Sequence, residues 1–337
     1  PAAPSHSARA RPAQLSVHAG TASTMKFRAT FGSAAQLTKL VVMLDKLAES
    51  CAVHLTADIV SFQLPPSASG GVQVAAELAQ RSIFLDHRIE SRAENNRITF
   101  FVKLTNLARA LRSCSRTQSE RVQVKLTKKM NGQPTLTFEI QLSDAQVQVL
   151  HDVPIRIVQD PAELQPYSEP EYSAAAEAIS VVLPQQDVRG LRNVVERMRV
   201  FSEYVLLTAS DGRAAGTGVA AAGDRNAKLK LQVEKDNLVE ISTTYRGLDS
   251  VQLPSSDDDQ HGDHISSPRP ALESCARVEI KRLARALQSL VASDIKMHSA
   301  ICCILPECAL ILKVFLPSAD EVGNQPSFVV FYFPVQL

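Results

Sequence analysis

The chain has 337 residues, of which 45% are hydrophobic, and a formal net charge of +1. This length suits two domains of ordinary size, and the hydrophobic fraction is sufficient for a substantial buried core. Aromatic residues make up only 5% and tryptophan is absent, which argues against proteins that bind single strands by stacking bases on aromatic rings. Because the overall charge is small, any contact with nucleic acid must come from local clusters of positive charge.

The sequence contains no apolar run of about 18 residues, so no transmembrane helix is expected. Its six cysteines have no regular spacing, which is typical of reduced intracellular thiols rather than of a disulfide framework. Residues 1–24 are rich in Ala, Ser and Pro and contain arginines but no acidic residue. That composition is compatible with a transit peptide, but we expect a disordered extension, with the folded part beginning at Met25.

The first domain, residues 25–158, is expected to contain two helices among many strands. Apolar residues at helical spacing predict a helix over about 33–49, with Ser33 as its cap, and a second over about 105–116, with Thr105 as its cap. Asn131-Gly132 between two alternating segments predicts a hairpin. The expected strands are 26–31, 51–57, 59–64, 72–78, 84–91, 97–104, 121–128, 134–141, 145–150 and 154–158.

Residues 159–178, with three prolines, several glutamates and a run of alanines, predict an interdomain connector. The second domain, residues 179–337, is expected to contain helices over about 186–200 and 279–292. The expected strands of this domain are 179–183, 203–210, 228–234, 237–245, 299–305, 309–316 and 327–335.

Two insertions in the second domain are expected to be mobile. Residues 211–227 consist mostly of small residues, and residues 249–274 form an acidic stretch with Ser, Pro and His.

One short sequence motif occurs twice in the chain, with small differences. Residues 106–113 read Asn-Leu-Ala-Arg-Ala-Leu-Arg-Ser, and residues 282–289 read Arg-Leu-Ala-Arg-Ala-Leu-Gln-Ser. A fainter echo relates residues 52–58 to 204–211, and the order helix, strand, second helix is the same in both halves. This self-similarity predicts two copies of one α+β domain, with helices on one face of a largely antiparallel sheet. The edge strands of such sheets must be covered or paired.

All four expected helices carry cations on the side away from their apolar stripe. One such face is usually just solvated, but four of four in a chain with so little net charge predicts contact with phosphates, independent of base sequence and sensitive to salt. Glu196 interrupts the set in the third helix. The predicted DNA-facing residues are Lys39, Lys46, Arg109, Arg112, Arg116, Arg189, Arg192, Arg199, Arg282 and Arg285.

Two repeated domains with helices that turn cations to one side resemble the sliding-clamp superfamily of proliferating-cell nuclear antigen. Several short sequence motifs, spread over residues 25–337, are similar to those of a narrower group, the Hus subunits of the heterotrimeric DNA-damage checkpoint clamp. The first 24 residues have no counterpart there, and the two insertions are longer than the family pattern. The matching phrases are Met25-Lys26-Phe27-Arg28-Ala29, Ala93-Glu94-Asn95-Asn96 before Leu107-Ala108-Arg109-Ala110-Leu111, Lys125-Leu126-Thr127-Lys128-Lys129, His151-Asp152-Val153-Pro154-Ile155, Val194-Val195-Glu196-Arg197-Met198 and Tyr332-Phe333-Pro334-Val335-Gln336-Leu337.

The resemblance implies the DNA clamp fold: sheets outside, two helices per domain inside, and three subunits closing a ring around double-stranded DNA. It implies a nuclear, non-catalytic subunit without a cofactor or metal, which signals to the checkpoint kinase and docks repair enzymes. The implied partners are Rad-nine-like and Rad-one-like subunits and an ATP-driven clamp loader. By position, a partner-docking groove is expected at Pro154, Ile155, Ile157, Val158, Phe331, Phe333 and Pro334.

Two alternatives to a checkpoint subunit remain. A self-sufficient homotrimeric replication processivity clamp would have the same fold. A nuclease would need a two-metal site, for which the acidic segment 257–264 offers Asp and His side chains, although a floppy charged loop is the expected interpretation. His151 and Asp152 are adjacent in a strand and point to opposite faces, so a catalytic pair is not expected.

Two further patterns are expected to be structural. The glycines of residues 216–223 only partly match a dinucleotide-binding loop, since the third glycine is misplaced and no parallel βαβ unit surrounds it. Cys302, Cys303 and Cys308 lack the Cys-x₂-Cys pair of a zinc site and are expected to be buried core thiols.

Overall fold

The computed structural model describes residues 25–116, 119–142, 148–170, 172, 178–211, 226–235, 239–251, 273–317 and 326–336. The expectations for residues 1–24 and for most of the two insertions, including the acidic segment 257–264, lie outside these residues.

The first half contains two helices among nine strands in the described residues, as the hydrophobic pattern predicts. Residues 145–150 and 154–158 are expected as two strands, but the described residues of these ranges form one strand, Gln148–Ile157. Its elements are β1 (Lys26–Phe31), α1 (Ala35–Asp45), β2 (Ser50–Leu55), β3 (Ile59–Leu64), β4 (Gln73–Ala79), η1 (Gln80–Ser82), β5 (Phe84–Glu90), η2 (Glu94–Asn96), β6 (Ile98–Lys103), α2 (Leu104–Arg116), β7 (Ser119–Lys128), β8 (Pro134–Leu142) and β9 (Gln148–Ile157).

Both predicted helix caps of the first half are wrong. Ala34 occupies the N-cap position of α1, and the Ser33 hydroxyl only accepts a long 3.4 Å hydrogen bond from the Ala35 amide. Thr105 lies inside α2, where its hydroxyl donates to Asp45 at the end of α1 at 2.8 Å. The threonine therefore ties the two helices together instead of starting one.

The second half follows a short connector helix and repeats the order of the first. Two strands differ from expectation: β14 was not predicted, and β13 continues beyond the predicted end at residue 245, because residues 246–251 and 273–279 show no clear apolar alternation. The elements are η3 (Pro161–Tyr167), β10 (Ile179–Pro184), α3 (Gln185–Met198), β11 (Tyr204–Ser210), β12 (Ala227–Lys235), β13 (Val239–Val251), β14 (Glu273–Glu279), α4 (Ile280–Ala292), β15 (Ser299–Leu305), β16 (Ala309–Phe315) and β17 (Phe328–Pro334).

Strand pairing confirms that the two halves are copies of one domain. In the first half β1 pairs with β5 and β7, and in the second β10 pairs with β13 and β15, all antiparallel. Likewise β2 lies between β3 and β6, as β11 lies between β12 and β14. The long β13 corresponds to both β4 and β5. It pairs with β12 as β4 pairs with β3, and then with β10 as β5 pairs with β1.

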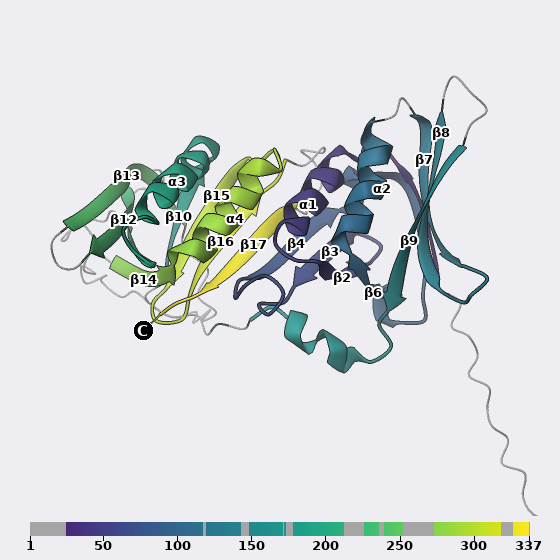
Figure 1. Ribbon diagram of the computed structural model, residues 1–337, viewed down its shortest axis with the longest axis horizontal. Helices are drawn as coiled ribbons and strands as arrows, with labels where there is room; N and C mark the ends of the chain where they lie inside the picture. The colour runs from purple at the N-terminus through teal and green to yellow at the C-terminus, as the bar shows by residue number, and fades with distance from the viewer. Residues whose placement is uncertain are drawn as a thin grey trace, which may run out of the picture.

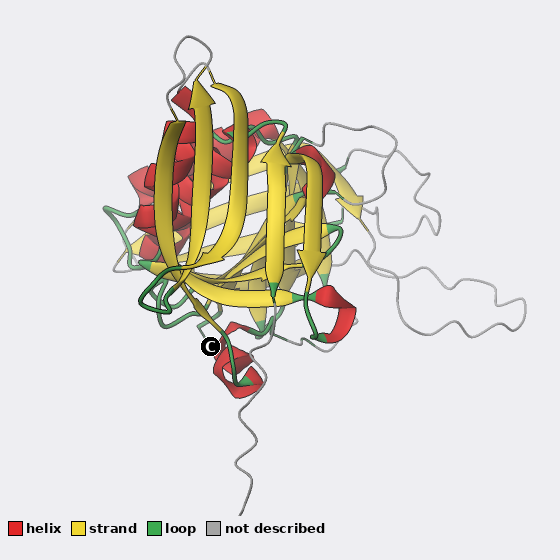
Figure 2. Cartoon of the chain, turned by 90° about the vertical axis from the view of Figure 1, so that its right-hand side faces the viewer, coloured by secondary structure: helices red, strands yellow, loops and turns green. Residues whose placement is uncertain are grey.

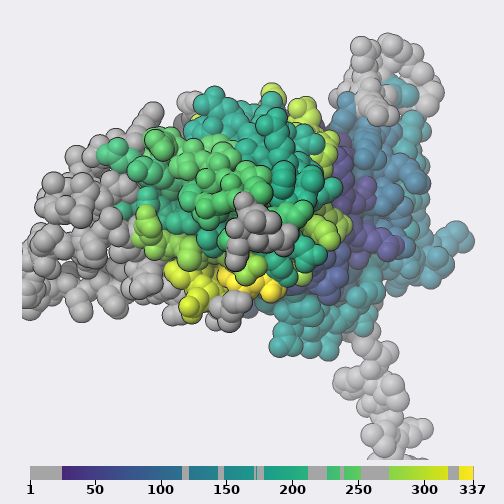
Figure 3. All heavy atoms as spheres, turned by 60° about the vertical axis from the view of Figure 1, so that its left-hand side comes forward, coloured from purple at the N-terminus to yellow at the C-terminus, as the bar shows by residue number. Residues whose placement is uncertain are grey.

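The two halves join edge to edge through β17 and β4. These strands pair antiparallel from Phe328 opposite Glu77 to Tyr332 opposite Gln73. At the centre of this junction Phe331 has no exposed surface, and one hydrophobic core runs through both halves. In the space-filling view the green surface of the second half lies directly against the purple and blue surface of the first (Figure 3).

The four α-helices of the described residues lie in a row on one side of the strands (Figures 1 and 2). Helix α2 packs beside α1, α1 touches α4 across the domain junction, and α4 packs beside α3. Each helix turns its apolar stripe to the sheet, for example Val188, Leu191 and Val195 of α3. The opposite side of every helix is left to polar and charged residues.

The turn before β4 requires glycine because its backbone adopts a left-handed conformation, and it also lies close to an arginine of the second half. Gly71 has φ +92°, and a Cβ there would lie 2.6 Å from the Arg282 guanidinium carbon. Gly190 lies inside α3, where a Cβ would be 3.6 Å from the Tyr245 hydroxyl, an ordinary contact.

The same substitution is therefore expected to have opposite effects at these two glycines. Gly71→Ala should lower the free energy of unfolding by about 1–3 kcal/mol through backbone strain and the displaced arginine. Gly190→Ala should raise it by about 0.5–1 kcal/mol, because alanine loses less backbone freedom in a helix. Urea unfolding of the two variants measures both, and a change of the same sign in both would contradict this account of the turn.

Candidate nucleic-acid interface

Exposed cations that make no ion pair with a described residue lie on all four helices or at their ends. Lys46 follows the end of α1, Arg109 lies on α2 and Arg189 lies on α3, and all three are solvent-exposed. On α4 they are Lys281 and Arg285. Arg112 of α2 is half-buried. The helices that carry these residues lie in one row on one side of the strands (Figure 1).

Two of the predicted DNA-facing residues make polar contacts between the halves. Lys39 donates to Asp294 at 2.9 Å, and this hydrogen bond holds the pKa of the Asp294 carboxyl below its usual range. Arg285 donates to the carbonyl oxygens of Lys46 and Leu47, at 3.3 and 2.8 Å. Arg285 thus satisfies carbonyls at the end of α1, where a cation also suits the helix dipole.

A third predicted residue, Arg282, also makes contacts within the protein. Its Nε donates to Glu279 at 2.7 Å, and its guanidinium lies against the Gly71 turn of the other half. The ion pair with Glu279 is local, but the contact with the Gly71 turn joins residues more than 200 positions apart, so no local pattern predicts it.

The remaining predicted cations differ in their surroundings. Arg199 is exposed and lies 3.5 Å from Glu196, the residue expected to interrupt this face. Arg192 is half-buried, its Nη1 reaches the Asn193 side chain at 3.4 Å, and its buried Nε has no hydrogen-bond partner among the described residues. Arg116 ends α2, and its side chain lies outside the described part of the structure.

The residues of the predicted docking groove differ in burial. Phe331 and Phe333 have 0% and 1% of their surface exposed, so the prediction is wrong for these two rings, which belong to the core. The alternation of β17 instead turns Tyr332 outward, where its hydroxyl donates to Glu169 of the connector at 2.9 Å. Pro334 is exposed.

The groove residues of β9 lie at a different place from those of β17. Pro154 is exposed, Ile155 is buried, and Ile157 and Val158 are half-buried. Pro154 and Ile155 line a cavity of about 520 Å³ that no β17 residue reaches. The structure therefore does not bring the two predicted halves of the groove into one cavity.

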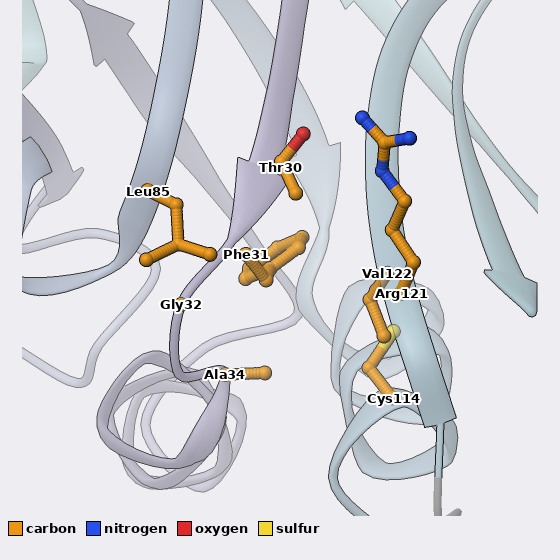
Figure 4. Close-up of a pocket in the computed structure, with 8 residues that line it drawn as sticks. All are labelled: Thr30, Phe31, Gly32, Ala34, Leu85, Cys114, Arg121 and Val122. Atoms are coloured by element: carbon orange, nitrogen blue, oxygen red, sulfur yellow. The ribbon is translucent and has the colours of Figure 1, made fainter. Parts of the chain in front are cut away.

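A second cavity, of about 490 Å³, lies where β1 leaves its sheet toward α1 (Figure 4). Phe31, Leu85 and Cys114 give it an apolar wall, while the Arg121 side chain extends along β7 away from the Cys114 sulfur. Burial raises the pKa of the Cys114 thiol to about 12, so this cysteine stays protonated near neutral pH. The cavity holds no acid–base pair.

The cysteines singled out in the sequence are not arranged as a site. Burial raises the pKa of the Cys302 thiol to about 12 and also raises that of Cys303, as expected for core thiols. Cys308 is exposed in the turn after β15, so the expectation of burial is wrong for this residue. Within the described ranges, no group of three or more His, Cys, Asp and Glu side chains could hold a metal ion.

His151 and Asp152 point to opposite faces of β9. Asp152 is exposed on the outer face, where it accepts hydrogen bonds from Lys129 at 2.7 Å and Thr137 at 2.8 Å. His151 is half-buried, and its Nε2 is buried without a hydrogen-bond partner in the described part of the chain.

No helix in the described residues is long and apolar enough to span a membrane.

The strand edges that stay unpaired in the described part of the chain include those of β9 and β13. Residues 148–154 of β9 pair only with β8, and residues 239–245 of β13 pair only with β12. The two edges lie toward opposite ends of the long axis (Figure 1). Exposed edges of this kind pair readily with strands of another chain.

Comparison with solved structures identifies the fold as that of the sliding clamps. The proliferating cellular nuclear antigen of Entamoeba histolytica aligns with a TM-score of 0.59 and 12% identity, over 92% of this chain and 99% of that one. The antigen from Thermococcus kodakaraensis aligns with a TM-score of 0.58 and 16% identity, over 92% of this chain and all of that one.

The sequence narrows this class to one family. A family model described as Hus1-like protein matches residues 25–336, and the chain belongs to that family. The checkpoint protein hus1 homolog of Dictyostelium discoideum is 26% identical over 313 residues, 92% of this chain and 98% of that protein. Checkpoint protein HUS1 of Homo sapiens is 28% identical over 293 residues, 83% of this chain and 91% of that protein.

Proposed function

We propose that this chain is a non-catalytic subunit of a ring-shaped checkpoint clamp that is loaded around damaged duplex DNA. The observation that carries the proposal is the row of four helices, which bears the exposed cations Lys46, Arg109 and Arg189. Cations on such a surface hold phosphates without reading base sequence, which suits a ring that must slide. Relatives named checkpoint proteins in Homo sapiens, Dictyostelium discoideum and Schizosaccharomyces pombe support the checkpoint role.

The ring closes, in this proposal, through the free edges of β9 and β13. The edge of β9 corresponds to that of β17 in the other half, and the edge of β13 corresponds to that of β4. Because β17 and β4 already pair within the chain, strands of neighbouring subunits would pair with β9 and β13 in the same way. Head-to-tail contacts of this kind generate a closed ring when the rotation between subunits permits it.

The partners of this ring are a Rad-nine-like and a Rad-one-like subunit, with an ATP-driven loader that opens and closes it. The clamp acts in the nucleus, where it signals to the checkpoint kinase and docks repair enzymes. In this role the chain supplies shape and charge rather than chemistry. The likeness to proliferating cellular nuclear antigens favours a second candidate, a self-sufficient homotrimeric replication clamp.

A topological experiment tests the encirclement. The chain, assembled with its two partner subunits, is loaded by the clamp loader onto nicked circular duplex and the free protein is removed. We expect the ring to stay on the circle and to leave within minutes after one restriction cut, because a ring slides off a free end. Retention that is unchanged by linearisation would contradict encirclement.

The mass of the chain separates the two candidate assemblies. We expect a monomer when the purified chain is analysed alone by light scattering, and a complex with one copy of each subunit after mixing. A stable trimer of the chain alone would favour the homotrimeric clamp instead.

A further inference from the structure

The junction that closes within the chain shows what a well-matched pair of edges looks like. Val329 lies opposite Ala76, Val330 opposite Ala75, and Phe331 opposite Val74. All six side chains are at most 4% exposed. Apolar cross-strand pairs thus form the centre of this junction, and such pairs are the main stabilising contacts between strands.

The internal repeat fixes which residues of β9 correspond to those of β17. Val335 bridges to Val278 of β14, and Ile155 pairs with Val102 of β6 at the equivalent place, just before the repeated helix. Counting back from these two residues, residues 148–152 of β9 correspond to residues 328–332 of β17.

The pairings of β3 and β12 relate β13 to β4 in the same way. Phe62 of β3 pairs with Ala76, and its counterpart Leu231 of β12 pairs with Thr243. Residues 240–244 of β13 therefore correspond to residues 73–77 of β4.

If two copies of this chain closed with that register, their edges would not match. Asp152 would lie directly opposite Glu240, and like charges in opposite positions destabilise a strand pair. His151 would lie opposite Ile241, and Leu150 opposite Ser242. Each of the five pairs in this register contains at least one polar residue, whereas the central three pairs of the internal junction are apolar.

The lysines beside these carboxylates do not remove the conflict. Lys129 holds Asp152 at 2.7 Å and lowers the pKa of its carboxyl, while Lys230 lies 3.8 Å from Glu240. Lys129 comes from the β7–β8 turn and Lys230 from β12, which are both on the inner side of the edge strands. Both carboxylates belong to strands whose outer edges are unpaired in the described residues.

We infer that Asp152 and Glu240 prevent this chain from closing a ring with copies of itself and select strands of other chains that carry a basic residue opposite each carboxylate. The inference rests on the proposed function, since it assumes that the two edges meet neighbouring subunits. His151 agrees with it, because its buried Nε2 needs a hydrogen-bond partner that the chain itself does not supply in the described residues.

Charge exchange tests the pair directly. Asp152→Lys and Glu240→Lys each convert the like-charged pair into an opposite-charged one, so each variant alone should self-associate more strongly than the natural chain. We expect a gain of roughly fivefold in the association constant for each junction, which multiplies over the three junctions of a ring. The double variant Asp152→Lys/Glu240→Lys places two lysines opposite each other and should return to the behaviour of the natural chain. Sedimentation velocity of the full chain over a range of concentrations measures all four proteins.

The double variant is the matched control, because a general effect of added lysines would make it associate most strongly of all. Single variants that sediment like the natural chain, or a double variant that associates as they do, would overturn the inference. Urea unfolding of each variant verifies that the fold is retained.

Coexpression with the two partner subunits separates this inference from the proposed function. Failure of the natural chain to assemble with them would contradict the proposed function. If the natural chain assembles, the double variant should be incorporated poorly, because lysines would then face the partners' basic residues. Equal incorporation of both proteins would leave the proposed function standing and overturn the role of Asp152 and Glu240.

Discussion

Replacing Lys46, Arg109 and Arg189 by glutamate is expected to weaken the hold of the assembled ring on duplex DNA by roughly a hundredfold at low salt. The three side chains are exposed and make no ion pair with a described residue, so their reversal should leave the fold intact. Each lost phosphate contact should also reduce the slope of log affinity against log salt by about 1, which gives about 3 for the triple variant. Fluorescence anisotropy of labelled duplex at several salt concentrations measures both quantities.

A matched reversal on the outer sheet controls for overall charge. Lys228 is exposed on β12, a strand of the sheets that the helices cover from the other side, and Lys228→Glu should change DNA affinity by less than about twofold. The arginines of α4 are unsuitable for this test, because Arg285 and Arg282 contact the other half of the chain. If the triple variant keeps the affinity and the salt slope of the natural ring, the helix row is not the DNA-facing surface.

Phe331→Ala is expected to lower the free energy of unfolding by about 3–5 kcal/mol, the range found when a buried phenylalanine is truncated. Phe331 lies at the centre of the β17–β4 junction with no exposed surface, and its ring stacks with that of Phe333 at 6.3 Å between centroids. A cavity there removes contacts from both halves at once. Urea unfolding followed by circular dichroism measures the loss.

Phe201→Ala supplies the comparison for this prediction. Phe201 follows α3 and is 39% exposed, so its truncation should change the free energy of unfolding by less than about 1 kcal/mol. A loss at Phe331 as small as that at Phe201 would mean that the two halves are held together by something other than this strand pair.

Much of this fold could be predicted from the sequence, because local patterns determine it. The apolar stripe of α1 and the alternation of β1 are set by residues close together in the chain. The periodic spacing of their apolar residues therefore predicts which side of each element is buried. The repeated phrase at residues 106–113 and 282–289 predicted two copies of one domain, and the equivalent pairings of β2 and β11 confirm it. The strand β14 was missed because it follows an acidic stretch without a clear pattern.

The candidate site was less predictable. Helix periodicity shows on which side of its own helix a residue lies, but not which other segments pack against that side. Periodicity turns Arg109 and Arg285 away from their own apolar stripes alike. Only the packing of α1 against α4 decides that Arg285 binds the carbonyls of Lys46 and Leu47, whereas Arg109 has no such contact among the described residues. The burial of Phe331 has the same origin, since an edge strand becomes a central one only when β4 pairs with it.

The sequence by itself determined the domain repeat, the helix-and-sheet composition of each half and the sign of the charge on every helix. Each of these depends on residues within a few turns or one hairpin of each other. The tertiary structure alone decided which cations stay available, which strand edges stay open and which residues would meet across them. Those properties depend on contacts between segments that are distant in the chain, and no local pattern specifies such contacts.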